Sequence, residues 1–449
     1  MDSEKLGKDN VISLLFKLAL PSIMGSLVFS LYMITDAIFI ERNCGTTALA
    51  GVFITFPAYM IMTSFSNMLG LGAASMISRF LGEKNLEGVK KAFGNYLLLV
   101  FASAIFVTTV SLVFMKPILQ VFGASSSTLP FSMEYMRIIF AGALFFMFGD
   151  SSNAIIRSEG GAKYTMTWII ISSLTNVFLD WYFMVPLKMG VTGAALATLL
   201  AGVMLFVANI YYFARIKTKI NLAEAHFRLD PQISKNIFKV GFSTFTAQFV
   251  NSGRAAILNH LLAFYGGDLA IAAYGILMNI FMFIAIPISG LMQGMQPILG
   301  YNYGAKLYKR AKESMILTLK WGTIFITIVS LLLIAFPKNI LAIFTTDQAL
   351  IEMTAFALIL FSITNPLTAI QMISGGIFQA LGKAKQATIL PLIRQLFILI
   401  PLIVVLSKFW GLNGIWYSFP LADIFGVIIV GYILLRELKR FDKLIAKTA

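Results

Sequence analysis

The chain has very little cysteine and very few charged side chains. Cys44 is the only cysteine among 449 residues, which excludes an intramolecular disulfide and a cysteine-based metal site. Only 12% of the residues are charged, whereas 58% are hydrophobic and the mean hydropathy is +0.84. Soluble domains carry about 25% charged residues. The composition therefore indicates an integral membrane protein.

Motifs that would indicate an enzyme are also missing. No glycine-rich loop ends in Lys-Ser or Lys-Thr, so ATP does not power the protein directly. No motif pairs a nucleophile with a base, and we expect neither catalysis nor a cofactor. The polar N-terminus, MDSEKLGKDN, is followed by no small-residue cleavage site, so we expect no removable signal peptide.

Long apolar segments recur along the whole chain. Each has about twenty or more residues, enough to cross the hydrocarbon of a bilayer as an α-helix. No polar stretch is long enough for a soluble domain. The sequence predicts an all-α membrane protein with twelve transmembrane helices, at about 12–40, 47–78, 92–115, 131–157, 163–185, 190–214, 237–264, 269–300, 313–336, 348–380, 386–408 and 414–437.

The positions of the basic residues predict the topology. The net charge of +15 would suggest a nucleic-acid partner in a soluble protein. Here, however, 26 of the 35 lysines and arginines fall on the side of the N-terminus, and five fall on the other side. Cytoplasmic loops carry the excess of positive charge. We therefore expect both termini in the cytoplasm, a location in the plasma (inner) membrane and no nucleic-acid partner.

The two halves of the chain repeat each other at an offset of about 222 residues. Leu81–Lys84 aligns with Tyr303–Lys306, and Gly72 aligns with Gly294. The repeat predicts two six-helix lobes, 1–215 and 235–449, related by a pseudo-two-fold axis along the membrane normal. The segment 216–234 is then a cytoplasmic linker, which we expect to need little defined structure.

Two polar residues lie inside an otherwise apolar segment, 169–185. Asn176 and Asp180 are four residues apart and share one face of a helix. A carboxylate at the centre of a bilayer costs about 2.5–3.5 kcal/mol on insertion scales. That cost is tolerated where the group binds a cation or a proton, or where it pairs with an arginine to hold helices together. The first alternative makes Asp180 a candidate functional residue, and the second makes it a packing residue.

The chain resembles the multidrug and toxic compound extrusion (MATE) family of transporters. The resemblance rests on QPILGYNYGA at 296–305, on GVTGAALAT at 190–198, and on Leu20-Pro21 with Asp36 in the first span. It covers essentially all twelve spans and implies a secondary active exporter of amphipathic, often cationic compounds. Such an exporter works by alternating access and is driven by inward H⁺ or Na⁺. The alternative within the same superfamily is a flippase for lipid-linked saccharides.

The resemblance also implies a cation site in the N-terminal lobe, of the kind found in the DinF-like and archaeal branch. The matching residues are Tyr32, Asp36, Tyr135, Asn176, Asp180 and Thr198. At 1.5 Å per residue along a helix, Asp36 and Asp180 fall in the outer half of the membrane, at depths compatible with those of Tyr135 and Thr198. Oxygen ligands of this kind at Asp36, Asn176, Asp180 and Thr198 suit Na⁺. Two adjacent carboxylates also suit a shared proton, because their like charges disfavour ionising both.

Further polar and flexible residues are candidates for lining a substrate cavity, and they are Asp150, Asn153, Gln248, Arg254, Met278 and Met282. For Asp150 and Asn153 the alternative is simple pairing between helices. Arg254 and Arg394 are costly cations inside the membrane. Either one of them pairs with Asp423, or they help to switch conformations or to bind anionic groups. We expect small amphipathic drugs and the lipid bilayer as partners, and a monomer as the working unit.

Overall fold

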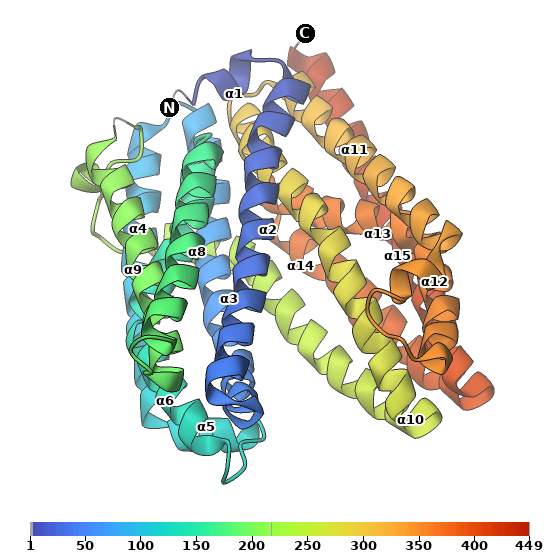
Figure 1. The fold of residues 1–449 in the computed structure, drawn as a ribbon. Coiled ribbons are helices and arrows are strands. Elements are labelled where there is room, and N and C mark those ends of the chain that lie inside the picture. Colours follow the sequence, from blue (N-terminus) through green and yellow to red (C-terminus); the bar gives the residue numbers. More distant parts are fainter. Residues whose placement is uncertain (1–2, 217, 449) are drawn as a thin grey trace. The chain divides into compact units, whose positions relative to one another are not determined.

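The structure is a computed structural model that describes residues 3–216 and 218–448 (Figure 1). This part of the chain is helical, with no strand. The helices are α1 (Lys5–Lys8), α2 (Val11–Cys44), α3 (Thr46–Gly82), α4 (Leu86–Val113), α5 (Met115–Val121), α6 (Leu129–Ala141), α7 (Ala143–Ser158), α8 (Ala162–Met184), α9 (Gly190–Arg215), the 3₁₀ turn η1 (Leu222–Glu224), α10 (Pro231–Gly304), α11 (Tyr308–Ala335), α12 (Pro337–Leu341), α13 (Gln348–Ala380), α14 (Ala384–Leu392), the π-helix η2 (Ile393–Leu399) and α15 (Ile400–Thr448).

Glycine kinks divide the two longest helices. Gly267 in α10 has φ 62° and ψ −161°, and Gly411 in α15 has φ 55° and ψ −133°. These left-handed φ values suit glycine, which has no Cβ, and they interrupt the regular helix. Gly267 therefore divides α10 into two spans, and Gly411 divides the continuous helical segment Ala384–Lys447 into two. A third break, at Gly142, bends α6 against α7 by 59° within one span.

By length and hydropathy, eight helices of the described chain qualify as membrane spans, and a ninth is the bent pair α6–α7. The helix α8 does not qualify, because Asn176 and Asp180 lower its hydropathy. Once α8 is included and α10 and the 384–447 segment are each divided at their glycine, the helices give the twelve spans expected from the sequence.

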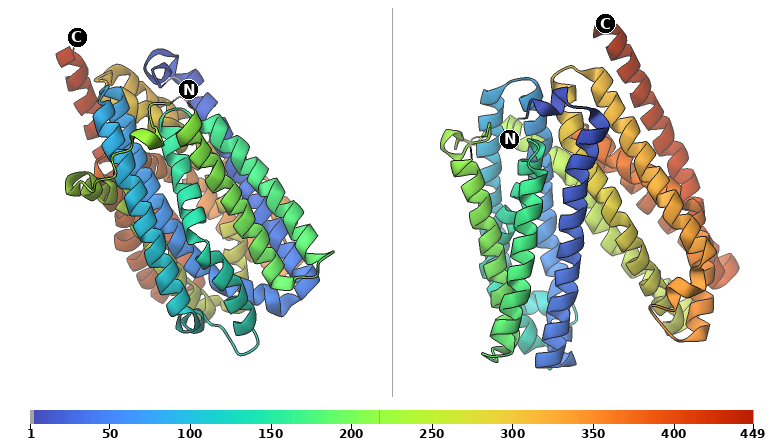
Figure 2. Two further views of the ribbon diagram at one scale, coloured as in Figure 1. Left: turned by 90° about the vertical axis from the view of Figure 1, so that its left-hand side faces the viewer. Right: turned by 45° about the horizontal axis from the view of Figure 1, so that its top comes forward.

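The chain packs as two compact units. The first contains the chain up to Leu6 and Leu20–Gly241, and the second contains Gly7–Ala19 and Phe242–Ala449. The helix α2 thus contributes its first residues to the second unit and the remainder to the first. In the first unit α8 packs along α9, and α3 packs along α7 (Figures 1 and 2). In the second unit α13 packs against both α11 and α15.

The repeated glycines Gly72 and Gly294 lie where two helices approach closely. A Cβ on Gly72 would lie 2.2 Å from the backbone oxygen of Ile237, and one on Gly294 would lie 2.8 Å from the backbone nitrogen of Ala19. Neither position has room for a larger residue, because the neighbouring atoms belong to backbone. The internal repeat therefore preserves a packing requirement at both positions.

The linker is docked on the first unit, contrary to the expectation of little defined structure. Asn95 of α4 donates to the backbone oxygen of Arg228 (3.2 Å) and accepts from the backbone N–H of Asp230 (2.8 Å). Lys90 also forms an ion pair with Glu224 at 3.0 Å. A buried amide that bonds two linker backbone groups fixes the path of the segment, which composition alone did not reveal.

The loop after α7 buries a carboxyl group. Glu159 is 2% exposed, and its Oε1 accepts a hydrogen bond from the hydroxyl of Tyr212 at 2.7 Å. Burial raises the pKa of Glu159 from 4.5 to about 7, although the hydrogen bond from Tyr212 partly opposes this shift. The folded protein therefore holds a proton here that the unfolded chain releases at lower pH.

We expect Glu159→Gln to remove a pH dependence of stability. A raised folded-state pKa contributes stability that is complete below pH 4.5 and is lost as the pH rises through about 7. The full effect is about 3 kcal/mol. Melting temperatures of the purified protein between pH 4.5 and 8 should fall in the wild type and change less in Glu159→Gln. Glu83→Gln, which alters an exposed carboxyl at the end of α3, is the control and should behave like the wild type.

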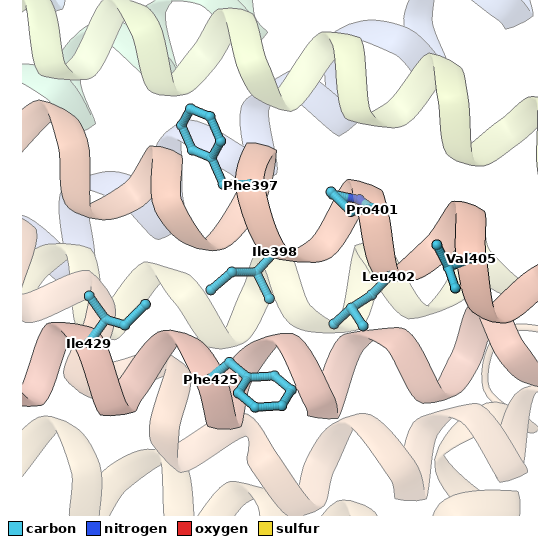
Figure 3. Close-up of a pocket in the computed structure, with 7 residues that line it drawn as sticks. All are labelled: Phe397, Ile398, Pro401, Leu402, Val405, Phe425 and Ile429. Carbon is cyan, nitrogen blue, oxygen red and sulfur yellow. The ribbon is translucent and has the colours of Figure 1, made fainter.

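The second unit also carries an apolar groove of about 440 Å³, between the segment around Phe397 and the later part of α15 (Figure 3). Every side chain that lines it is apolar, from Phe397 and Pro401 to Phe425 and Ile429. It offers no charged or polar side chain to an ion.

Candidate cation-coupling site

Four helices of the first unit converge on the residues expected to bind a cation. The helix α2 carries Tyr32 and Asp36, α6 carries Tyr135, α8 carries Asn176 and Asp180, and α9 carries Thr198. An apolar cluster joins these helices: Ile40, Met184 and Ala194 are buried together, and Tyr135 packs against them. The helices are thus held together by apolar contacts beside the polar residues.

Two carboxyl groups meet in the interior of this unit. Asp36 is 7% exposed and Asp180 is fully buried, and their carboxyls lie within hydrogen-bonding reach of each other. Two carboxylates both accept, so a hydrogen bond between them forms only when one of them holds a proton. Each group also has an oxygen, Oδ1, to which no residue of the described chain donates. The pair is therefore able to take up a proton or a small cation.

Asn176 links the acid pair to α9. Because the nitrogen and oxygen of an amide are assigned from their partners, two placements are possible. One leaves Nδ2 3.3 Å from Thr198 Oγ1. The other lets Nδ2 donate to Asp180 Oδ2 at 3.1 Å while the oxygen accepts from the Thr198 backbone N–H at 3.2 Å. We adopt the second placement, because it satisfies both ends of the amide.

Tyrosines close the site on its other sides. The hydroxyl of Tyr135 hydrogen-bonds with Thr198, and Tyr135 lies close enough to both acids to interact with their charge. Tyr32 neighbours both acids as well as Tyr135 and Tyr59. The structure thus brings all six expected residues together, and it adds Tyr59 of α3, which no motif of the sequence indicated.

A second carboxylate contact was also missed from the sequence. Glu134 of α6 accepts from the Thr192 backbone N–H at 2.9 Å and from the Thr192 hydroxyl. Its negative charge lies at the N-terminus of α9, where the helix dipole favours it. Glu134 precedes Tyr135, so this contact fixes the helix that carries Tyr135 against the helix that carries Thr198. The Thr192 in GVTGAALAT was the available signal.

Few oxygen atoms of the described residues are available at this site to bind Na⁺. No group of three His, Cys, Asp or Glu residues able to hold a metal occurs in the described residues. A sodium ion would have the two Oδ1 atoms and the Thr198 hydroxyl as oxygen ligands, since the Asn176 oxygen already accepts from a backbone N–H. Hard cations prefer a larger set of oxygens.

Comparison with known proteins identifies the family. The MatE family model matches residues 21–182 and again residues 244–405, which together make up well over half of the chain. The chain belongs to the MATE family. The double match also confirms the internal repeat, and MATE membership makes the chain a membrane transporter and not an enzyme.

Relatives of the MATE chain cover nearly its whole length. The multidrug export protein MepA of Staphylococcus aureus (strain NCTC 8325 / PS 47) is 27% identical over 93% of this chain and 92% of its own. The MATE multidrug transporter DinF-BH, solved in complex with a ligand, is 38% identical, with a TM-score of 0.89 over 97% of this chain and 98% of its own. A MATE protein in a bent conformation shares the fold at 24% identity, with a TM-score of 0.93 over 99% of both chains. The predicted twelve-helix, two-lobe fold is confirmed.

The residues expected to line a substrate cavity in this MATE protein lie in several different environments. Asp150 is exposed and accepts from Ser66 at 3.0 Å. Asn153 is 3% exposed and accepts from Asn209 at 3.4 Å, so it lies in the contact between α7 and α9. In the second unit, Gln248, Met278 and Met282 all lie on α10, and Met282 is 60% exposed.

One ion pair decides between the alternatives for Arg254 and Arg394. Arg394 donates from Nε to Asp423 Oδ1 at 2.7 Å, and its Nη2 lies 2.5 Å from the same oxygen. Asp423 also accepts from Thr364 at 2.9 Å. Arg254 has no such carboxylate partner in the part of the chain that the structure describes, and its Nε is buried without an acceptor. Arg394 is therefore the arginine that pairs with Asp423.

Proposed function

We propose that this MATE protein exports amphipathic, often cationic compounds by alternating access, in exchange for a cation that enters through the Asp36–Asp180 pair. The observation that carries the proposal is the contact between two buried carboxyls, each with an oxygen that accepts no hydrogen bond in the described chain. Export is also the activity that the name of MepA gives, and DinF-BH is named as a multidrug transporter; neither is named as a flippase. The flippase alternative is therefore not favoured.

The geometry favours H⁺ over Na⁺ as the coupling ion. A carboxyl–carboxyl hydrogen bond requires a bound proton. When the site loses that proton, two like charges face each other in an apolar surrounding, which is costly. We infer that this cost drives the site to another conformation when the proton leaves. Asn176 and Tyr135 would keep the two carboxyls facing each other while the proton binds and leaves.

Transport by reconstituted protein tests the proposal. Proteoliposomes that contain a cationic dye should export it when a pH gradient is imposed in the absence of Na⁺. A Na⁺ gradient at equal pH should give no more export than vesicles without protein. Export driven by Na⁺ alone would overturn the choice of ion, and the absence of export under either gradient would overturn the proposed function.

We also propose that both termini are cytoplasmic. In a Cys44→Ser background, an impermeant maleimide should label Lys116→Cys and Lys338→Cys in intact cells, because both positions are exposed in connections predicted to lie outside. Arg228→Cys should react only after the cells are permeabilised. Labelling of Arg228→Cys in intact cells would contradict the topology.

We propose a monomer as the working unit, because all six coupling residues belong to the first unit of a single chain. The mass of the purified protein, measured by light scattering with the detergent subtracted, should be that of one 49.5 kDa chain. A stable dimer would contradict this.

A further inference from the structure

The second unit contains a polar pocket that the acid pair does not explain. Its volume is about 260 Å³, and it is formed by residues of α10, α13, α14 and η2. The polar lining includes Ser243, Thr244, Gln371, Gln379, Arg394 and Gln395. Every lining residue belongs to the second unit, whereas the proposed coupling site lies in the first. The pocket is therefore a separate candidate site.

The pocket has no net charge to attract an ion. Arg394 is the only ionisable side chain in the lining, and its guanidinium already makes two contacts with Asp423. Asp423 is 4% exposed and receives a further hydrogen bond from Thr364. A cationic ligand would be repelled by the charge of Arg394 and would find no free carboxylate to bind. An anionic ligand would have to compete with Asp423 for the guanidinium of Arg394. The charges favour an uncharged ligand.

Three glutamines line the pocket, and the amides of two of them are incompletely bonded. Gln371 is 9% exposed, and its Nε2 donates to the backbone oxygen of Asp423 at 3.0 Å. The Oε1 of Gln371 and that of Gln395 are buried, and neither accepts a hydrogen bond from the residues described. A buried acceptor without a donor costs about 1–3 kcal/mol, so a ligand N–H that reached it would be stabilised.

A rare helix geometry presents two of these residues. Arg394 and Gln395 both lie in η2, a π-helix that runs from Ile393 to Leu399. Single π-turns inside α-helices are uncommon and occur frequently at functional sites. Here the wider turn places the amide of Gln395 next to the guanidinium of Arg394 in the lining of the pocket.

The remaining walls are apolar and adaptable. Met292, Met372, Leu390 and Pro391 line the pocket beside the amides. Methionine side chains fill irregular gaps and adjust to different ligand shapes. The volume lies just below the range of about 300–1,000 Å³ that holds drug-sized ligands. The pocket therefore suits a compact ring system.

We propose that this pocket binds uncharged, flat compounds that carry an amide-like N–H, such as lactams. The ligand N–H donates to a glutamine oxygen of the pocket, and its ring packs against the methionines and Pro391. This gives the protein a second ligand class, beside the cations that the proposed function assigns to export. The inference does not depend on how export is coupled to an ion.

A matched pair of probes tests the proposal. Quinolin-2(1H)-one carries the N–H, and 1-methylquinolin-2-one has the same ring with a methyl group in its place. Equilibrium dialysis against the purified full-length protein, with empty micelles subtracted, should show about tenfold tighter binding of the N–H probe. Equal binding of both probes to the wild type would overturn the proposal.

Two variants locate the binding within the pocket. Gln395→Met keeps the length of the side chain but removes one of the two acceptor amides, and it should reduce the preference for the N–H probe. Gly426→Ala acts without removing a polar group, because its Cβ would lie 2.9 Å from Gln371 Oε1 and displace that amide. Gln348→Met, on the exposed start of α13, is the matched control and should keep the preference.

Two further measurements keep the result interpretable. Melting temperatures show whether each variant is folded. If Gln395→Met is unfolded, the probe binding of Gly426→Ala decides whether the ligand lies in this pocket. A preference that is undiminished in every folded pocket variant would overturn the assignment. Export of a cationic dye is measured in the same preparations and should be unchanged in both variants. Loss of dye export in the wild type would contradict the proposed function alone, since the probe comparison does not use transport.

Discussion

Replacing either Asp36 or Asp180 with asparagine should reduce gradient-driven dye export to the rate of vesicles without protein. An asparagine keeps the shape and the hydrogen-bonding capacity of the side chain, but it neither takes up nor releases a proton at neutral pH. The remaining carboxyl of the pair then has no acidic partner. When it loses its proton, no second negative charge lies beside it to repel it. We expect protein level and equilibrium dye binding to stay close to those of the wild type.

Neutral members of the site should have milder effects. Asn176→Ala removes the donor to Asp180 Oδ2, and Thr198→Ala removes the hydroxyl that bonds Tyr135, but both leave the acid pair in place. A hydrogen bond to a charged group contributes about 1.5–3 kcal/mol, so roughly a tenfold weaker dependence on the driving ion is expected. The initial rate of export measured against the size of the imposed gradient would show this.

Asp268→Asn is the matched control for the acid pair. Asp268 is an exposed carboxyl beside the kink at Gly267 in the second unit, so its loss should leave export unchanged. Wild-type export by both Asp36→Asn and Asp180→Asn under an imposed gradient would mean that the pair does not couple transport. The ion pair of Arg394 and Asp423 would then be the next place to look for the coupling group.

Arg394→Met should destabilise the protein by about 3–5 kcal/mol. The side chains of Arg394 and Asp423 are 18% and 5% exposed, and removing the arginine leaves a carboxylate buried without its counter-charge. The energy is dominated by that unpaired charge rather than by the attraction within the pair. We expect a markedly lower midpoint temperature in thermal unfolding of the purified protein.

The double variant Arg394→Met/Asp423→Leu separates the unpaired charge from a general packing defect. Removing both charges should recover most of the lost stability, because apolar residues of similar size replace a buried pair at little cost. Lys338→Met is the matched control: its partner Glu352 is 3.9 Å away, and both side chains are more than 60% exposed. Surface pairs of this kind contribute less than about 1 kcal/mol. A double variant as unstable as Arg394→Met would show that packing, and not charge, causes the loss.

Much of the architecture was predictable from the sequence, for one physical reason. A bilayer leaves backbone groups no partner except each other, so long apolar segments must form helices. The twelve spans, the repeat and the pairing of Asn176 with Asp180 on one face all follow from spacing along single segments. Asp180 was a predictable candidate because a carboxylate in an apolar helix is costly enough to require a purpose, and its grouping with Asp36 was implied by the resemblance to the MATE family.

The exceptions show where that reasoning ends. Hydropathy alone misses α8, which carries two residues of the proposed coupling site. The reason is that Asn176 and Asp180, the polar side chains of that site, lower the mean hydropathy of the helix. The linker looked unstructured because nothing in its composition indicates that Asn95, more than a hundred residues earlier, bonds its backbone.

The sequence by itself determined that this is a twelve-helix membrane protein with a repeated half and buried acids. Only the tertiary structure decided which other polar groups meet: Glu134 with the start of α9, and Arg394 rather than Arg254 with Asp423. The reason is the range of the interactions. Burial and helix formation depend on neighbours within a few turns, whereas a hydrogen bond or ion pair between helices depends on the depth and rotation of each, which no single segment specifies.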